Sequence, residues 1–354
     1  MRIALLLVFV WGLFGQPGVK ARGVAAREAG RLPESTRLLR EYLRANPKDG
    51  EAWWYVGLNA YDRDEHTGCA EAFGRVYALD AKNAGAAAFL GLCEFRLGKF
   101  ETAFSHIVLA RKAGLLPGSE LEKVAHHHYL MLLNKLGQFE LAASLLAGVA
   151  RATPELPFLE SMCGLSALRM RFLPMEIPTE LQEAVRMAGK ASVLAFQRRT
   201  ADAMGVGRAL LAKYPKLGNV HYLMGYLALL DQSPESIAYF EREIELDPGH
   251  VQARLQIAYE YLKRGEAARG LPYAAEAARR APEEFTARNI YGRLLLDLGQ
   301  AREALPELEA AVRLAPNSPE AHFHLSTAYG RLERTEEARK HREIFSRLEK
   351  ERKP

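Results

Sequence analysis

Apolar residues recur along most of this chain at helical spacing, and charged residues fill the positions between them. On a helix this spacing gathers the apolar side chains on one face. One example is YGRLLLDLGQAREALPELEAAVRLAP (291–316), where a first helix ends near Gly299 and a second ends at Pro316. Ala, Leu, Glu and Arg dominate, and runs of β-branched residues are scarce. The pattern predicts an all-α protein.

The predicted helices come in pairs that repeat along the chain. Linker prolines at Pro215, Pro248, Pro282 and Pro316 are 33, 34 and 34 residues apart. Small residues keep the same period, since the positions of Gly292, Gly299, Ala304 and Ala311 are occupied 34 residues earlier by Ala258, Gly265, Gly270 and Ala277. Such a period is the signature of a repeat architecture.

Small residues allow the two antiparallel helices of a pair to approach closely. We therefore expect Gly57 and Gly292 in first helices to face the small residues Cys69 and Ala304 in second helices. Each linker proline then ends the second helix and fixes the direction in which the chain leaves it.

Trp53, Gly57 and Phe73, the segment LGKFETA (97–103) and the linker prolines resemble the tetratricopeptide repeat family. The resemblance implies a right-handed superhelical α-solenoid of antiparallel helix pairs, with about 8–9 repeats. Counted in phase, the repeats fall at 16–49, 50–83, 84–117, 123–156, 217–250, 251–284, 285–318 and 319–352. The segment GSELE (118–122) is an insertion between two of them.

Four segments follow from this phase. Residues 1–21 read as a signal peptide, 22–156 as a first array, 157–216 as degenerate repeats or a helical connector, and 217–354 as a second array closed by a charged capping helix. Within the connector we expect one helix over 158–172 and two more at roughly 180–197 and 201–213.

The N-terminus carries the pattern of an export signal. Met1-Arg2 is followed by the apolar run IALLLVFVWGLF (3–14), by Pro17, and by small residues that place cleavage near Ala21. Twelve apolar residues are too few to span a bilayer. We expect an exported, periplasmic or secreted protein without a stable membrane span, and the alternative is that this run forms a buried first helix.

Composition gives little support for other classes of partner. The net charge is +5, but acidic and basic residues are interleaved, as on solvated helix faces, so a nucleic-acid surface is not expected. Three cysteines, Cys69, Cys93 and Cys163, are too few for a disulfide framework and match no metal motif. A bond between Cys69 and Cys93 on neighbouring helices is possible if the protein is exported.

Candidate chemistry is sparse. The run His126-His127-His128 places three imidazoles about 100° apart around a helix, and only Glu122 with His126 could form a ligand pair. AGKAS (188–192) lacks the glycine spacing and the strand of a phosphate loop. We therefore expect no metal, no cofactor and no enzymatic activity.

The resemblance implies that the first helices line a concave groove that binds peptides or partner proteins. The positions one step beyond the core positions are predicted to face it: Trp54, Leu58, Tyr61, Leu92, Phe95, His127, Met131, Asn134, Tyr222, Tyr226, Leu255, Tyr259, Lys263, Asn289, Arg293 and Phe323. The set is aromatic and aliphatic with few charges, which is typical of an interaction surface. The alternative is that many of these side chains pack against the next repeat.

This register also separates the two adjacent tryptophans. Trp53 is predicted to lie in the core, and Trp54 to face the groove with little effect on stability. The predicted function is a non-enzymatic scaffold for protein–protein interaction, and exported relatives imply a role in envelope assembly or secretion. Two alternatives are a module that presents a partner enzyme, such as polysaccharide machinery, and a cytosolic adaptor that keeps its first helix.

Overall fold

The computed structural model describes residues 18–156 and 158–352, and every regular element in these ranges is a helix. The elements are α1 (Val19–Glu28), α2 (Leu32–Ala45), α3 (Gly50–Asp62), α4 (His66–Leu79), α5 (Ala84–Arg96), α6 (Phe100–Ala113), α7 (Glu120–Lys135), α8 (Phe139–Ala152), α9 (Leu159–Ala167), η1 (Pro174–Glu176), α10 (Thr179–Phe196), α11 (Thr200–Lys213), α12 (Val220–Leu230), α13 (Ser236–Leu246), α14 (Val251–Lys263), α15 (Ala267–Arg280), α16 (Phe285–Asp297), α17 (Ala301–Leu314), α18 (Pro319–Arg331) and α19 (Thr335–Arg352). The predicted all-α fold is confirmed.

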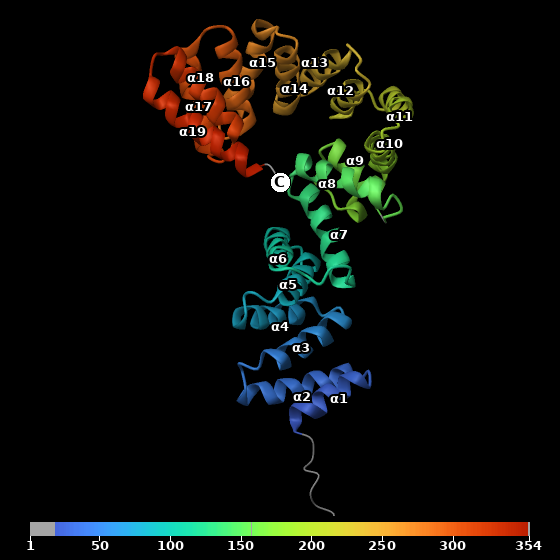
Figure 1. Ribbon diagram of the computed structural model, residues 1–354. Coiled ribbons are helices and arrows are strands. Elements are labelled where there is room, and N and C mark those ends of the chain that lie inside the picture. The colour runs from blue at the N-terminus through green and yellow to red at the C-terminus, as the bar shows by residue number, and fades with distance from the viewer. Residues whose placement is uncertain (1–17, 157, 353–354) are drawn as a thin grey trace, which may run out of the picture. The chain divides into compact units, whose positions relative to one another are not determined.

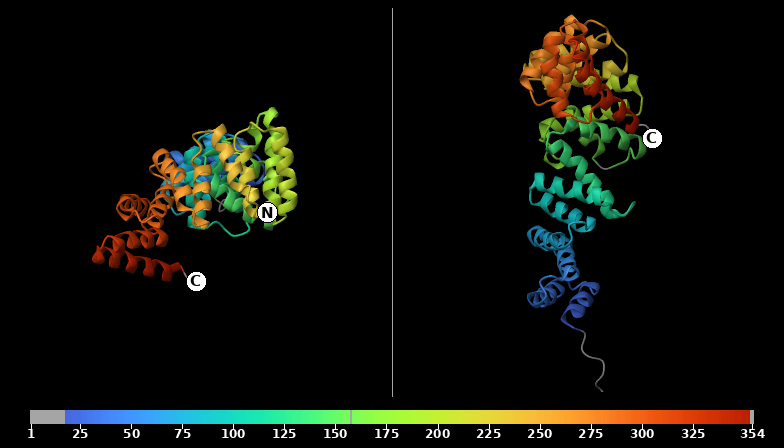
Figure 2. Two further views of the ribbon diagram at one scale, coloured as in Figure 1. Left: turned by 90° about the horizontal axis from the view of Figure 1, so that it is seen from above. Right: turned by 60° about the vertical axis from the view of Figure 1, so that its left-hand side comes forward.

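The chain divides into two compact units. Unit 1 runs to Ala142 and includes Arg171–Leu173, and unit 2 comprises Ala143–Met170 and continues from Pro174. Within unit 1, α1 packs on α2, α3 on α4 and α5 on α6; within unit 2, the same pairing joins α12 to α13, α14 to α15, α16 to α17 and α18 to α19 (Figures 1 and 2). The helix pairs therefore match the predicted repeats at both ends of the chain. In the described part, no helix is long and apolar enough to cross a membrane.

Several pairs close where a glycine in the first helix meets a large side chain in the second. A Cβ atom at Gly57 of α3 would lie 2.8 Å from the ring of Phe73 in α4, and a Cβ at Gly292 of α16 would lie 2.6 Å from Leu308 in α17. The side chain nearest to Gly57 is thus that of Phe73, and the expected small partner is seen at Gly292, where a Cβ would lie 3.5 Å from the Ala304 carbonyl oxygen. Glycine is required because Phe73 or Leu308 occupies the space that a side chain would need.

Linkers between repeats are fixed by one recurring hydrogen bond. The indole N–H of Trp53 donates to the carbonyl of Pro47 at 2.9 Å, six residues earlier. His221, Arg288 and His322 make the same bond to Pro215, Pro282 and Pro316. A proline cannot donate a hydrogen bond from its own nitrogen, but its carbonyl accepts one from the next helix. The repeat position of Trp53, which was predicted to lie in the core, therefore also supplies a hydrogen-bond donor to the linker carbonyl.

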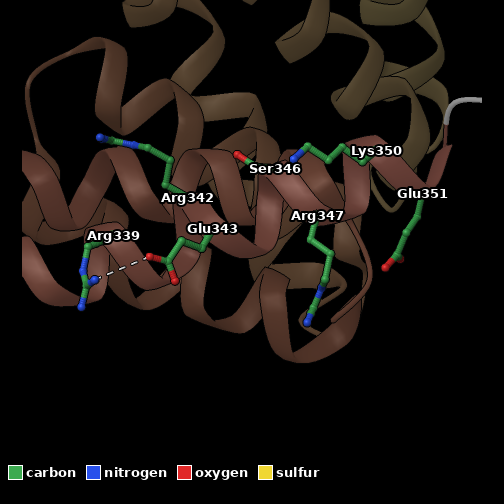
Figure 3. A pocket seen from close by; sticks show the side chains of 7 residues that line it. All are labelled: Arg339, Arg342, Glu343, Ser346, Arg347, Lys350 and Glu351. Atoms are coloured by element: carbon green, nitrogen blue, oxygen red, sulfur yellow. Dashed lines mark ion pairs between the residues drawn. The ribbon is translucent and has the colours of Figure 1, made fainter.

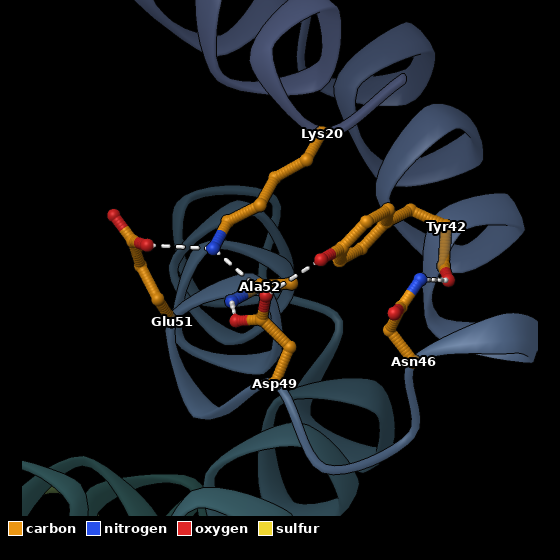
Figure 4. A network of polar contacts seen from close by, with 6 residues as sticks. All are labelled: Lys20, Tyr42, Asn46, Asp49, Glu51 and Ala52. Atoms are coloured by element: carbon orange, nitrogen blue, oxygen red, sulfur yellow. Dashed lines mark hydrogen bonds and ion pairs between the residues drawn. The ribbon is translucent and has the colours of Figure 1, made fainter. Parts of the chain in front are cut away.

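The first helix pair is held to the second by an ionic cluster around Lys20 (Figure 4). Its ammonium donates to Asp49 at 2.8 Å and to Glu51 at 2.6 Å, while Tyr42 donates to Asp49 at 3.0 Å. Burial opposes both charges, yet these hydrogen bonds raise the pKa of Lys20 and lower the pKa of Asp49. Most of the predicted signal peptide, residues 1–17, lies outside the described residues.

The connector departs from regular pairing. Helix α9 ends at Ala167, so the expected helix over 158–172 is too long, whereas α10 and α11 lie close to the predicted ranges. The chain turns at Arg169, whose φ is 53°, and the prolines follow. Helices α9 and α10 cross with backbones in contact, since a Cβ at Gly164 would overlap the carbonyl of Val185. The insertion 118–122 is partly helical, because α7 begins at Glu120 with Ser119 as its N-cap.

A disulfide joins two consecutive repeats of unit 1. Cys69 of α4 and Cys93 of α5 are bonded, with their Cα atoms 6.0 Å apart and a separation of 24 positions in sequence. Both residues are buried, as is the free Cys163. The bond explains why position 69, which the register predicts only as small, holds a cysteine.

The two tryptophans both contribute to packing. Trp54 meets Phe73 and Phe89 edge to face, with ring centroids 5.3 and 5.7 Å apart. A Cβ at Gly85 would lie 2.8 Å from the Trp54 indole, so the next repeat leaves space for this ring. Trp53 packs against a separate core around Leu39 and Val56. The expectation that Trp54 stands outside the core is therefore wrong.

We predict that Gly57→Ala destabilises the protein by about 1–3 kcal/mol, because the new methyl group overlaps the Phe73 ring. The matched control is Gly74→Ala in α4, where a Cβ would meet nothing within 4 Å. There the better helix propensity of alanine should stabilise by up to about 1 kcal/mol. Chemical denaturation of both variants measures the difference, and a neutral Gly57→Ala would contradict the proposed contact.

We also predict that Trp54→Ala costs about 3–5 kcal/mol, as for other large aromatic residues truncated in a core. The loss should be similar for Trp53→Ala, and thermal unfolding of the two variants provides the comparison. Trp54→Phe serves as the conservative variant, which keeps a ring between Phe73 and Phe89. A loss below about 1 kcal/mol for Trp54→Ala would restore its assignment as a groove residue.

Candidate partner-binding groove

The structure separates the predicted groove residues by exposure. Seven are buried within the array, and for these the expected exposure is wrong: Leu92, Phe95, Met131, Asn134, Tyr222, Leu255 and Asn289. Four are half-buried: Trp54, Leu58, His127 and Arg293. Five are exposed: Tyr61, Tyr226, Tyr259, Lys263 and Phe323. The alternative prediction, that groove residues are buried by packing within the array, therefore applies to almost half of the sixteen residues.

The buried positions in unit 2 show what covers them. Tyr222 of α12 packs on His250, with ring centroids 4.8 Å apart, and Asn289 of α16 is hydrogen-bonded through Oδ1 to Nδ1 of His324 in α18. His250 caps α14, since its Nδ1 accepts from the Ala253 N–H and its Nε2 donates to Asn219. Burial, followed by the charge of Arg169, lowers the pKa of His250 to about 4, so the ring stays neutral.

One turn further along the first helices, the side chains emerge from this packing. Tyr226 of α12 is 39% exposed and Tyr259 of α14 is 45% exposed, and the two occupy equivalent positions in consecutive repeats. The amide of Gln256 donates to the Tyr226 hydroxyl at 3.0 Å. The Lys263 ammonium lies 5.6 Å from the centre of the Tyr259 ring. We call these four residues the tyrosine surface.

The tyrosine surface is positioned by the core beneath it. The Tyr226 ring meets Tyr222 at 5.3 Å and Phe240 at 6.2 Å between centroids. Phe240 in turn occupies the space left by Gly225, where a Cβ would lie only 2.5 Å from its ring. Lys263 is held by an ion pair of 2.7 Å with the buried carboxylate of Glu260. The exposed rings therefore stand on fixed neighbours rather than on a loop.

Phe323 is exposed for a different reason. It occupies the position that is buried as Tyr222, Leu255 and Asn289 in the preceding repeats, yet it is 49% exposed. Within the described residues no further first helix follows α18 to cover it, and its ring meets those of Phe345 in α19 and the adjacent His324, at 5.4 and 5.7 Å between centroids.

In unit 1 the exposed aromatic surface is smaller. Tyr61 of α3 is 37% exposed and meets Phe89 of α5 edge to face at 5.2 Å. Phe89 was not among the predicted residues, and neither was Gln256. Gln256 lies three residues before Tyr259 on the same helix face, so its place beside the predicted groove residue could have been found from the sequence.

The three histidines of α7 point to different surroundings. His128 is bonded through Nδ1 to the Val124 carbonyl at 2.8 Å, and burial lowers its pKa to about 4. Burial also lowers the pKa of His126 and of His127. Among the residues described, no group of three His, Cys, Asp or Glu side chains is placed to hold a metal ion.

The C-terminal helix presents a charged face to solvent (Figure 3). Its shallow hollow is lined by side chains of α19 alone: Arg339, Arg342, Glu343, Ser346, Arg347, Lys350 and Glu351. Arg339 lies 3.7 Å from Glu343 in an ion pair. Both signs of charge on one exposed face are typical of a solvated cap, as the sequence predicts for this helix.

Comparisons with known proteins identify the repeats. The tetratricopeptide repeat family model matches residues 20–68, 255–300 and 292–341. Among solved structures, the 41-end form of MamA from Desulfovibrio magneticus RS-1 is similar, at 18% identity over 49% of this chain and 98% of that chain, with a TM-score of 0.45. YrrB, described as a TPR protein with an unusual peptide-binding site, is 17% identical over 49% of this chain and 92% of that chain, with a TM-score of 0.43. No curated protein matches the chain.

The family match falls on α1 to the start of α4 in unit 1, and on α14 to the first turns of α19 in unit 2. The pairs α5–α6 and α12–α13, outside the matched segments, close through the same contact between a first-helix glycine and a large second-helix side chain. Period, helix bounds and family match agree, and the matched segments are tetratricopeptide repeats.

Proposed function

We propose that this protein is an interaction scaffold, and that unit 2 binds an extended segment of a partner protein across the tyrosine surface. The observation that carries the proposal is the pair Tyr226 and Tyr259, exposed at equivalent positions of consecutive first helices. Tyrosine gives a large contact area with few rotatable bonds, and it is enriched in binding hot spots. Lys263 adds a charge at the edge of the same surface.

The repeat geometry suits an extended ligand. Packed helices lie roughly 8–10 Å apart, and an extended peptide rises about 3.3 Å per residue. Side chains on one face of such a peptide are separated by an even number of residues, so a bound segment that crosses α12 and α14 would meet Tyr226 and Tyr259 with side chains two or four residues apart, roughly 7 or 13 Å. The prior ordering of the Tyr226 ring by the core lowers the entropy cost of binding.

We predict that a photo-crosslinking residue at position 226 or 259 captures the partner, whereas the same residue at the exposed Ala238 of α13 does not. With the captured partner purified, Tyr226→Ala and Tyr259→Ala should each weaken binding at least about tenfold. Arg242→Ala, on the exposed side of α13, is the matched control and should leave the affinity unchanged. Equal capture from positions 226 and 238 would contradict the proposed surface, and thermal unfolding checks that each variant remains folded.

We further propose that the protein is exported, with residues that precede α1 acting as the signal. The apolar run 3–14 after a basic start supports this, and so does the Cys69–Cys93 bond, since disulfides persist in oxidising compartments. The ionic cluster of Lys20 favours cleavage at or before Val19 over cleavage after Ala21, which would remove Lys20. A role in envelope assembly or secretion belongs to the same proposal.

Mass spectrometry of the protein from its native source tests export. We expect a mature N-terminus at or before Val19, and a single free thiol, that of Cys163, under denaturing conditions. A chain that retains Met1 would contradict export. A chain that begins at Arg22 would keep export and overturn the argument from Lys20.

A further inference from the structure

We propose that a hollow between α6 and α7 of unit 1 is a binding site for an oxyanion, a phosphate or carboxylate group, held by Arg111, Lys123 and His126. The site is independent of the tyrosine surface, which belongs to unit 2. It lies where the insertion 118–122 lengthens the connection between two repeats.

The hollow has a volume of about 560 Å³ and is lined by six residues: Arg111, Gly114, Leu115, Glu122, Lys123 and His126. Arg111 comes from the last turn of α6, Gly114 and Leu115 from the connecting loop, and the other three from the first two turns of α7. The N-terminal end of α7 adds the positive end of a helix dipole. Three side chains that can donate hydrogen bonds thus surround one space.

Arg111 is held in place without a carboxylate partner. Its guanidinium lies over the ring of Tyr129, 4.0 Å from the ring centre, and the described part of the chain offers it no ion pair. Stacking fixes the plane of the guanidinium but leaves its N–H groups at the edge, where they can bind two oxygens of one anion. An arginine ordered in this way is preorganised for a bidentate contact.

The acidic groups nearby are already engaged. Glu122 accepts a hydrogen bond of 2.6 Å from the backbone N–H of Gly118, within the inserted loop. Lys123 pairs with Glu120 at 2.7 Å, but both side chains are largely exposed, so the pair contributes little and can open. The lining therefore carries one net positive charge, from Arg111 and Lys123 against Glu122, and two when His126 is protonated.

His126 couples anion binding to protonation. Burial, followed by the charge of Arg111, lowers its pKa, while Glu122 acts in the opposite direction and His127 adds a small effect of the same sign as Arg111. An anion seated beside Arg111 would cancel that charge and favour the imidazolium, which then donates a further hydrogen bond. A metal ion fits less well, because Glu122 and His126 supply only two ligands and two cations stand beside them.

The insertion accounts for the position of the site. In the other regular linkers, such as 80–83 and 247–250, the second helix is followed almost directly by the next first helix. Here Gly114 and Gly118 adopt φ values of 89° and 76°, which open a wider loop between α6 and α7. The same five residues supply Glu122, whose bond to Gly118 closes that loop.

The test is an NMR titration of His126 in the full chain, with inorganic phosphate, acetate and chloride compared at equal ionic strength. We expect the titration midpoint of His126 to rise in phosphate or acetate, with His127 and His128 as internal references. Arg111→Gln should weaken phosphate binding roughly tenfold or more. Arg111→Lys should weaken it by less, because lysine keeps the positive charge but lacks the planar pair of N–H donors of the guanidinium. Lys112→Gln is exposed, adjacent and outside the lining, so it should leave the shift intact.

The two anions distinguish the sources of the group. A shift with phosphate alone assigns a phosphorylated ligand, and a shift with acetate as well assigns a carboxylate-bearing one. If the titration midpoint of His126 is the same in all three salts, or if its rise in phosphate persists in Arg111→Gln, the proposal is overturned. Thermal unfolding of the variants in chloride shows whether Arg111 acts only through its packing on Tyr129.

Discussion

The close contact between the two helices of a repeat is the constraint on which the rest of this structure depends. In three of the repeats, glycine in the first helix leaves room for Phe73, Phe240 or Leu308 in the second. That contact sets the distance and rotation of each pair, so it also decides which positions of the first helix turn outward. The exposure of Tyr226 and Tyr259 follows from Gly225 and its neighbours as much as from the tyrosines themselves.

Sequence periodicity predicted the helix pairs because it depends on contacts within one repeat. The bounds of α14 to α18 lie close to the predicted repeats, since small residues and prolines recur there without interruption. Contacts between repeats were predicted less well. Tyr222 and Asn289 are buried against residues of the following repeat, and the pattern of one helix does not predict how closely the next helix packs on it.

Some of the missing information was nevertheless present in the sequence. Ring or guanidinium N–H donors stand six residues after a linker proline at Trp53, His221, Arg288 and His322, and each donates to that proline's carbonyl. Arg254, six residues after Pro248, is the exception and donates to the His250 carbonyl. These side chains differ in size and charge but share an N–H donor. A search for periodic hydrophobic residues therefore does not detect the position they share. The pairing of Cys69 with Cys93 was open from sequence because it joins two repeats.

That disulfide changes how unit 1 responds to mechanical load. In a stack where each repeat contacts only its neighbours, a pulling force applied to the two ends can peel repeats away one at a time. The bond bridges two points 24 residues apart in sequence, so the turn between α4 and α5 lies inside a closed loop that force cannot extend. Helices α4 and α5 therefore stay joined under load, and the chain keeps a short inextensible segment beside the aromatic cluster of Trp54 and Phe89.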